Sequence, residues 1–564
     1  MLIKRVHIFH LALENIKRGL ALCNPTFSAS KWKLFILAFF MFGFNQFIVA
    51  QTNQSNITIS TSPNSNGTWS GAGTQASPYV YTPTGLNSNI LSTDLVTKLN
   101  SGYVTINTAY TGGTAGAGTV VFSTSISSTS SITTARKFVI NAYGSITVSS
   151  AITLTTNSAA GNENFLSNSI EFNSSTGGIY INALVKTIPS NTFSSTILTG
   201  TNGGDITLTA SAGIISMSNL GSLETNGQFN SNPSSSAKGG NGGNIVLNGI
   251  NGISILGAIK TDAGNRQLGS YIGSFPGNLT VNTNNATVTT AGGVNDGQGA
   301  STFTLSIGNL IKQGTGTFSL KSSTYGGYLT PGYNIYSPSV TVSAGTLKLL
   351  GATSLYDYAD IVVASGATFD LNAFSETIST IEGAGTITSA SAATLTLLYN
   401  NPDPAKLITT YSGTISGAIS LYKSSNQVDN HGYLYLTGSG SNFTGSTTVR
   451  IGGILVGHAN ALGSASGTTT VLNGGTVGVF GGITIAEPFN IRGNGEGGIG
   501  VLRDSSGINT FTGAITLDST AYITTLNGTS SDSLRLGAVN LGTYTLTIYN
   551  NVGVQAMGII AGTG

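Results

Sequence analysis

Hydrophobic and polar residues alternate in short pieces along most of the chain. The clearest case is Gly203–Gly264, which holds two near-copies of one phrase. Gly203 matches Gly242 and Gly213 matches Gly252, both at an offset of 39 residues. In both copies Ile and Leu alternate with Thr, Asn or Ser, over pieces of about 4–6 residues bounded by Gly or Asn. This pattern predicts short β-strands joined by tight turns.

The spacing of these strands predicts how they assemble. The turns are too short to hold crossover helices, so strands that return at a fixed period must wind into a β-solenoid, an all-β fold. Alternate side chains should then point into the core and stack on their equivalents one coil away. The expected inward residues are Ile206, Leu208, Ile245, Leu247, Ile253 and Ile255, and the expected outward residues are Thr207, Thr209 and Ser254.

The composition agrees with a solenoid. Among 564 residues there are 77 glycines and only 42 charged side chains, 22 Lys or Arg and 20 Asp or Glu. Gly and Asn suit corners with positive φ, and β-branched residues suit the flat faces. Low-complexity disorder has a similar composition, but regular alternation through the whole chain argues against it.

The first fifty residues do not follow the pattern. Met1–Ala50 carries six Lys or Arg against one acid, Glu14, and the apolar run Leu34–Phe44 comes before Ala50. A basic region, an apolar run of about 11 residues and a small residue predict a secretory signal peptide. A membrane anchor is the alternative, but it wants about 18 uninterrupted apolar residues, and Asn45-Gln46 ends this run.

Removing the signal peptide changes the charge balance. It takes away six basic residues and one acid, which leaves 16 basic and 19 acidic residues and a net charge of −3. The remaining chain then has no excess of basic residues with which to bind nucleic acid. The single cysteine, Cys23, lies before the apolar run, so neither a disulfide nor a lipidated cysteine is expected in the secreted part.

Residues 51–110 are predicted to cover the N-terminal end of the solenoid. An uncovered end would expose unpaired backbone and apolar core. A two-turn helix is expected over Asp94–Leu99, with Ser92 or Thr93 as its N-cap and Gly102 as its stop.

Phrases with the same alternation occur at Asp94–Thr108, Gly144–Thr156 and Gly177–Thr187. Together with the two copies in Gly203–Gly264, they resemble the haemagglutinin-type repeats of large bacterial surface adhesins. The resemblance to filamentous-haemagglutinin-like adhesins covers roughly Leu91 to Gly264. It implies that residues 111–264 form a right-handed, single-stranded parallel β-helix.

A different phrase repeats in residues 301–564. Gly345 matches Gly453 and Gly366 matches Gly474, both at an offset of 108, and the paired glycines in each copy are 21 residues apart, which predicts one coil. These copies resemble the autotransporter-associated β-strand repeat found in passenger regions of bacterial secreted proteins.

Two further segments carry weaker signals. Residues 265–300 show little alternation and are predicted to be a loop or junction between the two repeat zones. The last residues, Met557–Gly564, read like the start of another copy, so we expect the sequence to be a fragment or a truncated product.

Residues that could carry chemistry are few and scattered. Catalytic sites on β-helices gather several acids and a base on adjacent coils. Here the acids stand singly, and solvated corner carboxylates are the expected reading of each. The groups considered are Asp357 with Asp360, Glu376 with Glu382, and Glu496 with Arg503 and Asp504.

Histidines and glycine-rich loops add little. His431 follows Asp429, so an acid–base or metal role is conceivable, although a polar turn before a strand is the favoured reading. His458 lies at a repeat corner with no acid nearby. Gly239–Leu247 has Asn where a calcium-binding repeat needs Asp, and Gly493–Gly500 lacks the Lys of a phosphate loop. We therefore expect no catalytic, cofactor-binding or metal-binding residue and no cofactor.

The sequence favours a secreted or cell-surface adhesive protein, associated with the outer membrane and built on an elongated β-helical stalk. Its expected partner is a host, matrix or polysaccharide ligand, with no nucleic acid and with membrane contact only through export or anchoring. A β-helical polysaccharide lyase or glycoside hydrolase is the alternative. An ice-binding solenoid is disfavoured, because Thr-x-Thr pairs such as those in Gly144–Thr156 do not recur in step.

Overall fold

The computed structural model contains two units, Met1–Thr52 and Asn53–Gly564. The first unit, with the predicted signal peptide and Cys23, lies outside the described residues. Within the described residues, no helix is long and apolar enough to cross a membrane. The described ranges are 53–111, 115–130, 136–156, 168–189, 201–228, 239–262, 276–284, 288–289, 305–320, 339–352, 354–401, 403–525, 533–550 and 553–563.

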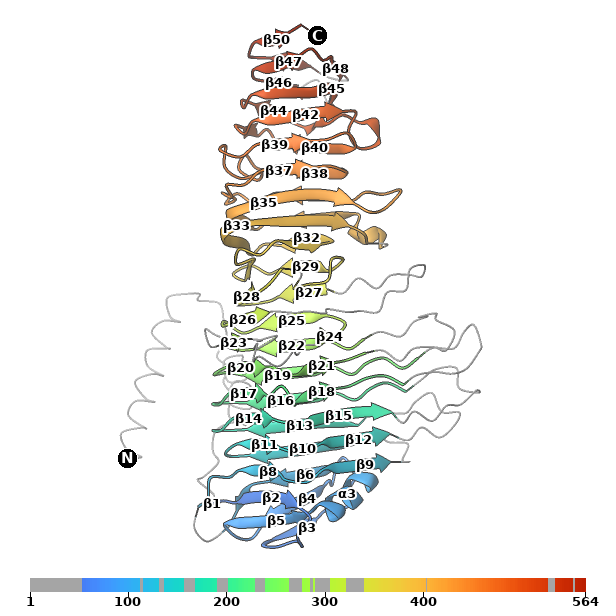
Figure 1. Ribbon diagram of the computed structural model, residues 1–564, viewed down its shortest axis with the longest axis vertical. Helices are drawn as coiled ribbons and strands as arrows, with labels where there is room; N and C mark the ends of the chain where they lie inside the picture. Colours follow the sequence, from blue (N-terminus) through green and yellow to red (C-terminus); the bar gives the residue numbers. More distant parts are fainter. Residues whose placement is uncertain are drawn as a thin grey trace, which may run out of the picture. The chain divides into compact units, whose positions relative to one another are not determined.

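In the first half of the second unit, successive coils supply strands to three parallel sheets, consistent with a parallel β-helix (Figure 1). One sheet contains β6 (Val104–Asn107), β10 (Lys137–Ala142), β13 (Ser169–Ser174), β16 (Ile206–Ala210), β19 (Ile245–Gly249) and β22 (Leu279–Asn282). The second contains β2 (Asn56–Ser60), β5 (Asn87–Leu91), β8 (Val120–Phe122), β11 (Ile146–Val148), β14 (Ile179–Ile181), β17 (Ile215–Met217) and β20 (Ile253–Ile255). The third contains β9 (Ile126–Ser130), β12 (Ile152–Thr156), β15 (Leu184–Pro189), β18 (Ser222–Glu224), β21 (Ala258–Lys260) and β24 (Leu305–Ser306).

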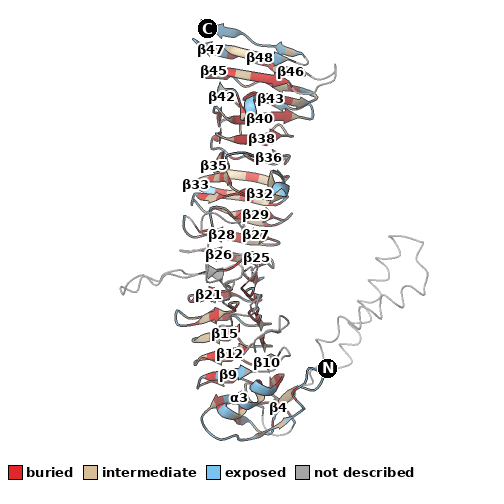
Figure 2. Cartoon of the chain, turned by 90° about the vertical axis from the view of Figure 1, so that its right-hand side faces the viewer, coloured by how far each residue is buried: buried red, intermediate tan, exposed pale blue. Residues whose placement is uncertain are grey.

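The register of these sheets confirms the predicted alternation. Ile206 pairs with Ile245, and Leu208 pairs with Leu247, at the predicted offset. All six expected inward residues are buried, and the three expected outward residues are partly exposed. Because side chains alternate between the two faces of a strand, identical parity in every coil builds one continuous apolar core. Figure 2 shows buried positions recurring through the strands of this unit.

In the second half, two parallel ladders run the length of the stack, and a third joins near its end. The first ladder contains β25 (Leu310–Gln313), β27 (Ser339–Val342), β29 (Asp360–Val363), β32 (Thr380–Gly383), β34 (Ile408–Tyr411), β36 (Tyr433–Leu436), β38 (Gly452–Val456), β40 (Gly475–Phe480) and β43 (Leu502–Ser506). The second contains β23 (Val288–Thr289), β26 (Thr317–Leu320), β28 (Thr346–Leu349), β30 (Thr368–Asp370), β31 (Glu376–Ile378), β33 (Thr386–Tyr399), β35 (Thr414–Ser425), β37 (Thr447–Val449), β39 (Thr469–Val471), β42 (Phe489–Gly493), β47 (Val539–Gly542) and β50 (Ile560–Gly562). Strand β45 (Ile515–Thr525) belongs to both ladders and continues the first into β48 (Leu546–Asn550); the third contains β41 (Thr484–Ile485), β44 (Ile508–Phe511), β46 (Ser533–Leu536) and β49 (Val554–Ala556).

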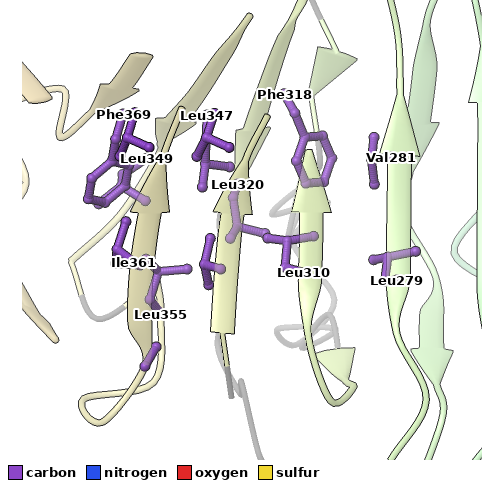
Figure 3. Packing of buried hydrophobic residues seen from close by; sticks show 14 of the residues in the cluster. Leu279, Val281, Leu310, Phe318, Leu320, Leu347, Leu349, Leu355, Ile361 and Phe369 are labelled. Carbon is purple, nitrogen blue, oxygen red and sulfur yellow. The ribbon is translucent and has the colours of Figure 1, made fainter. Parts of the chain in front are cut away.

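The predicted 21-residue coil holds for one strand pair of the second repeat zone and is wrong for others. Ser339 pairs with Asp360, which is the predicted step, but Thr346, directly after Gly345, pairs with Thr368, a step of 22 residues. In the later copy, however, Gly452 pairs with Gly475, a step of 23 residues. A solenoid tolerates this difference because the extra residues are accommodated in the corner loops, while the strands keep their register. Figure 3 shows the inward side chains of several coils, from Leu279 to Phe369, packed beside one another.

Residues 265–300 are not wholly a loop, which corrects the prediction for Leu279–Asn282. This segment forms β22, which pairs in parallel with β19 on one side and β25 on the other. Its Leu279 and Val281 are fully buried. The ladder therefore continues from the first repeat zone into the second through this strand.

The N-terminal end of the described chain contains its antiparallel pairs. Strand β1 (Asn53–Gln54) pairs with β7 (Ala109–Tyr110), and β3 (Gly67–Ser70) pairs with β4 (Tyr79–Pro83). The Nε1 of Trp69, on β3, donates a 2.8 Å hydrogen bond to Asp94, on the following helix. These contacts tie the irregular first segment to the first coil.

Helix α3 (Ser92–Ser101) lies where a helix was predicted, but its start differs. Its N-cap is Leu91, with no capping side chain, so neither Ser92 nor Thr93 is the cap. Leu91 is the last residue of β5 and already has extended backbone, and the chain passes directly from strand to helix. Gly102 follows the helix as predicted, and its N–H donates to the carbonyl of Lys98.

The end of α3 covers the edge of the third sheet. Asn100 Oδ1 accepts hydrogen bonds from the backbone N–H of Thr129, at 3.0 Å, and from Ser128 Oγ, at 2.7 Å, both on edge strand β9. The buried guanidinium of Arg136 donates to the carbonyl of Leu99, within the last turn of the helix. A side-chain amide thus replaces the missing neighbouring strand, and a cation neutralises the helix C-terminus.

Candidate functional site

Four of the ionisable residues singled out from the sequence lie at one corner of the second repeat zone, together with two lysines. Strands β29, β32 and β36, together with the ends of β33 and β35, bring them together across several coils. We call this group the corner cluster; its members are Asp360, Glu382, Lys406, Lys423, His431 and Glu496. A shallow hollow opens beside it, lined among others by Thr380, Tyr399, Lys406, Lys423 and Tyr433.

Asp360 lies at the lower end of the cluster and is only 5% exposed. Its carboxylate accepts a 2.7 Å hydrogen bond from Thr380 Oγ1 and another of 2.7 Å from Asn401 Nδ2. Burial raises the pKa of Asp360, while these bonds and the nearby Lys406 ammonium oppose the rise. Lys406 itself forms an ion pair with Glu382.

Lys423 occupies the centre of the cluster and is 3% exposed. Its Nζ donates to the carbonyl oxygens of Ser424 and His431, both at 3.0 Å. It also lies over the ring of Tyr399, 5.8 Å from the centroid. Burial lowers the pKa of Lys423 to about 7, against a smaller raising effect of Glu496. The buried ammonium therefore has carbonyl partners and one acid within electrostatic reach.

His431 and Glu496 form the upper end of the cluster. His431 Nδ1 lies 2.7 Å from Glu496 Oε1, and Glu496 Oε2 accepts a 3.2 Å hydrogen bond from the N–H of Gly452. A glutamate on Nδ1 orients the imidazole and leaves its other nitrogen free, an arrangement that can accept or donate a proton. The acid partner of His431 is therefore Glu496, from a loop 65 residues away, and not the neighbouring Asp429 considered from the sequence; as favoured there, His431 lies just before a strand, β36.

The other groups considered from the sequence are not brought together. Asp357 is exposed while Asp360 is buried. Glu376 does not join Glu382; it is 2% exposed and accepts hydrogen bonds from the N–H groups of Ser354, at 2.8 Å, and Leu355, at 3.3 Å. Burial raises the pKa of Glu376 to about 7. The reading of these acids as solvated corner carboxylates is thus wrong for Asp360 and Glu376, because each receives donors from a neighbouring coil.

Glu496 is likewise separate from the two residues placed with it. Asp504 is buried and accepts a 2.6 Å hydrogen bond from Asn509 Nδ2, whereas Arg503 donates from Nε to Ser505 Oγ at 3.2 Å. His458 only accepts a 3.3 Å hydrogen bond from the N–H of Asn460. Period two explains the split, since Arg503 and Asp504 are adjacent and must face opposite sides of β43.

Sequence reasoning missed several buried charged groups. Lys312 donates to the carbonyls of Gln313, Gly314 and Ala344, and burial lowers its pKa to about 8. Glu487, 3% exposed, accepts from Thr469 Oγ1 at 2.8 Å, and burial raises its pKa to about 7. For the lysines the signal was present: Lys312 follows Leu310 by two residues and Lys423 follows Leu421 by two, so both share the inward parity.

The cluster can move a proton at His431 and present positive charge at the hollow. Each of its three acids already has a partner: Asp360 accepts from neutral donors, Glu382 pairs with Lys406, and Glu496 contacts His431. No group of three or more His, Cys, Asp or Glu that could hold a metal ion occurs among the described residues.

Comparison with known proteins adds one similarity. The chain is 30% identical over 312 residues to a protein named "Adhesin BmaC autotransporter" from Brucella suis biovar 1 (strain 1330). The match covers 50% of this chain but 8% of the relative, so the chain spans a small part of that protein's length. No protein-family model and no solved structure matches the chain.

Proposed function

We propose that this chain is part of a secreted, cell-surface adhesin, in which a right-handed β-helix with an N-terminal cap forms an elongated stalk. The observation that carries the proposal is the similarity to an autotransporter adhesin, together with parallel ladders whose outer positions are mostly uncharged. A stack of coils suits this role, because many weakly interacting outer side chains repeat along one axis and can act together.

The predicted signal peptide supports secretion, and the absence of mature cysteines fits a protein stabilised by its stacked core alone. The proposed location is the bacterial surface, in association with the outer membrane. The proposed partner is a host, matrix or polysaccharide ligand.

The test is direct binding of labelled protein to host cells, immobilised matrix proteins and a polysaccharide array. We expect saturable binding to at least one of these surfaces and no release of reducing sugar from the array. A protein that binds none of them, with its fold intact by circular dichroism, would contradict an adhesive role.

A β-helical carbohydrate-active enzyme is the second candidate, and the His431–Glu496 pair beside the hollow is the observation that favours it. The matched test replaces His431 with Ala and Glu496 with Gln. Under the adhesin proposal, binding survives both replacements. Polysaccharide turnover that is present in the parent protein and lost in either variant would favour the enzyme.

A further inference from the structure

A row of register positions on the face opposite the core runs along the first ladder of the second repeat zone, from β34 to β48; Figure 1 labels β38, β40, β45 and β48 of this ladder. Members of the row are register partners on successive strands, so their side chains lie one above another. In order along the stack they are Thr410, Tyr435, Leu455, Gly478, Arg503, Thr524 and Tyr549. Leu455, Gly478 and Thr524 are buried, so Thr410, Tyr435, Arg503 and Tyr549 are the members that present surface to solvent.

Aromatic rings lie at both ends of this row. The ring of Tyr435 lies beside that of Phe480, with centroids 5.7 Å apart. Toward the other end, Tyr549 is stacked on Tyr522, with centroids 5.7 Å apart and planes at 14°, and Tyr549 is 59% exposed. Tyr435, Phe480 and Tyr522 are half-buried, so both pairs present part of their ring surface on the outer face. Grouped aromatic rings on a surface are frequent at contact sites.

Arg503 lies between the two aromatic pairs, three strands from Tyr435 and two from Tyr549. At about 4.8 Å per strand, these steps are about 14 Å and about 10 Å. The guanidinium lies over Gly478: a Cβ added there would be 3.6 Å from Arg503 Nε and 3.3 Å from Leu455. Arg503 therefore lies within van der Waals contact of the sheet face at this position, and the tighter neighbour is Leu455.

The charge of Arg503 is not neutralised within the described part of the chain. Its recorded polar partner is the hydroxyl of Ser505, and no carboxylate lies within ion-pair distance. Glu496 is close enough to influence the same tyrosine as Arg503, Tyr433, but its carboxylate is taken by His431 and Gly452. The outward positions of β36, β38, β40, β43 and β48 contain no acid, and the exposed Asp518 of β45 lies six residues before Thr524, next to the part of that strand that pairs with β42.

We propose that this face, which we call the aromatic row (Tyr435, Phe480, Arg503, Tyr522 and Tyr549), binds an acidic polysaccharide laid along the stack. The inference deepens the proposed adhesive function and rests on it. Aromatic rings take up the apolar faces of sugar rings, and the guanidinium fork binds a carboxylate or sulfate through two parallel hydrogen bonds. Without its first fifty residues the chain has a net negative charge. Arg503, an unneutralised cation between the two aromatic pairs, therefore favours a negatively charged ligand at this position.

The experiment measures binding of the purified full chain to heparin, to polygalacturonate and to neutral dextran. Arg503→Gln removes the charge, Arg503→Lys keeps the charge without the fork, and Tyr549→Ala removes an exposed ring. Arg492→Gln is the matched control, since Arg492 is an exposed arginine on β42, in the other ladder. Melting curves of all variants check the fold.

We expect the parent to bind at least one acidic polysaccharide and not dextran, with an affinity that falls as salt is added. Arg503→Gln should weaken binding by about tenfold or more, Arg503→Lys by less, Tyr549→Ala by a measurable factor, and Arg492→Gln not at all. Equal binding by Arg503→Gln and the parent, no binding to either acidic probe, or equal binding to dextran would overturn the inference. If cell or matrix adhesion persists in any of those cases, the proposed function stands while the aromatic row is excluded as its glycan site.

Discussion

At the scale of single residues, the stacked coils are held together by strict alternation of inward apolar and outward polar side chains. The exceptions are charged side chains at inward positions, which extend to the corners of the coils. Lys312 and Lys423 take inward positions that Ile or Leu fill elsewhere, and both are almost fully buried. Each extends its ammonium to carbonyl oxygens that the corner leaves without a strand partner. A long side chain with three donors suits this task, because an unpaired buried carbonyl costs about as much as a lost hydrogen bond.

Replacing Leu247 with Asp is expected to destabilise the protein by several kcal/mol, because the new carboxylate would be buried among apolar side chains. Leu247 is 1% exposed, between Leu208 and Val281 on neighbouring strands. Thermal melting and the soluble fraction on expression measure the effect.

The control for that replacement must be outward and away from other acids. Thr207→Asp, at a predicted outward position, places a second acid beside Glu171 and should cost a few tenths of a kcal/mol. Ser254→Asp lies beside Ser216 and should be nearly silent. Similar losses for Leu247→Asp and Ser254→Asp would contradict the strand parity.

Glu487 gives a pH dependence with a defined sign. Burial raises its pKa in the folded protein from 4.5 to about 7, so the folded state binds more protons than the unfolded state between these values. Its contribution to stability is therefore fully present below about pH 4.5 and is lost as pH rises through about 7. Glu487→Gln should have the same melting temperature as the parent at pH 4.5 and a higher one at pH 8. The corresponding gain in the free energy of unfolding is at most about 3 kcal/mol, because one pKa unit corresponds to about 1.4 kcal/mol.

That result depends on the hydrogen bond from Thr469, which a Gln oxygen can still accept. Asp429→Asn, at an exposed position in a turn, serves as the control and should leave the pH profile largely unchanged. A parent protein whose melting temperature does not fall between pH 4.5 and pH 8 relative to Glu487→Gln would contradict burial of an ionisable group at this site.

At the scale of elements, the glycine-rich loop Gly493–Gly500 is the clearest case in which a local sequence makes sense only through a remote contact. Five of its glycines have positive φ, which lets the chain turn sharply around Glu496. The loop is attached through Glu496 N to Thr476 Oγ1, at 2.8 Å, and through the Glu496 carboxylate to His431. It therefore joins several coils of the stack.

Replacing His431 with Ala should loosen this loop without unfolding the column. The change removes the 2.7 Å contact to Glu496, worth about 1–3 kcal/mol for a hydrogen bond to a charged group. Amide hydrogen exchange across Gly493–Gly500 should quicken by about tenfold or more, while β38 and β40 stay protected. His458→Ala is the matched control, because His458 contacts only its own turn among the described residues; equal exchange in both variants would show that the His431 contact does not hold the loop.

At the scale of the whole molecule, we expect the 21-residue and 39-residue repeats to produce a right-handed, three-sided rod. Taking about 20 coils at roughly 4.8 Å each gives a length on the order of 100 Å. Small-angle scattering measures this directly, and a compact, spherical particle would contradict it. Right-handedness is expected because nearly all parallel strand crossovers have that hand.

The sequence by itself determined the strands, their parity and their direction, as the buried Ile206 and Leu247 and the outward Thr207 show. These properties are local: period two, corner glycines and short turns suffice to specify them. The tertiary structure alone decided which residues meet across coils. His431 contacts Glu496 and not Asp429, and Glu376 accepts hydrogen bonds away from Glu382. The sequence could not show this, because the register between coils depends on corner lengths that vary along the chain.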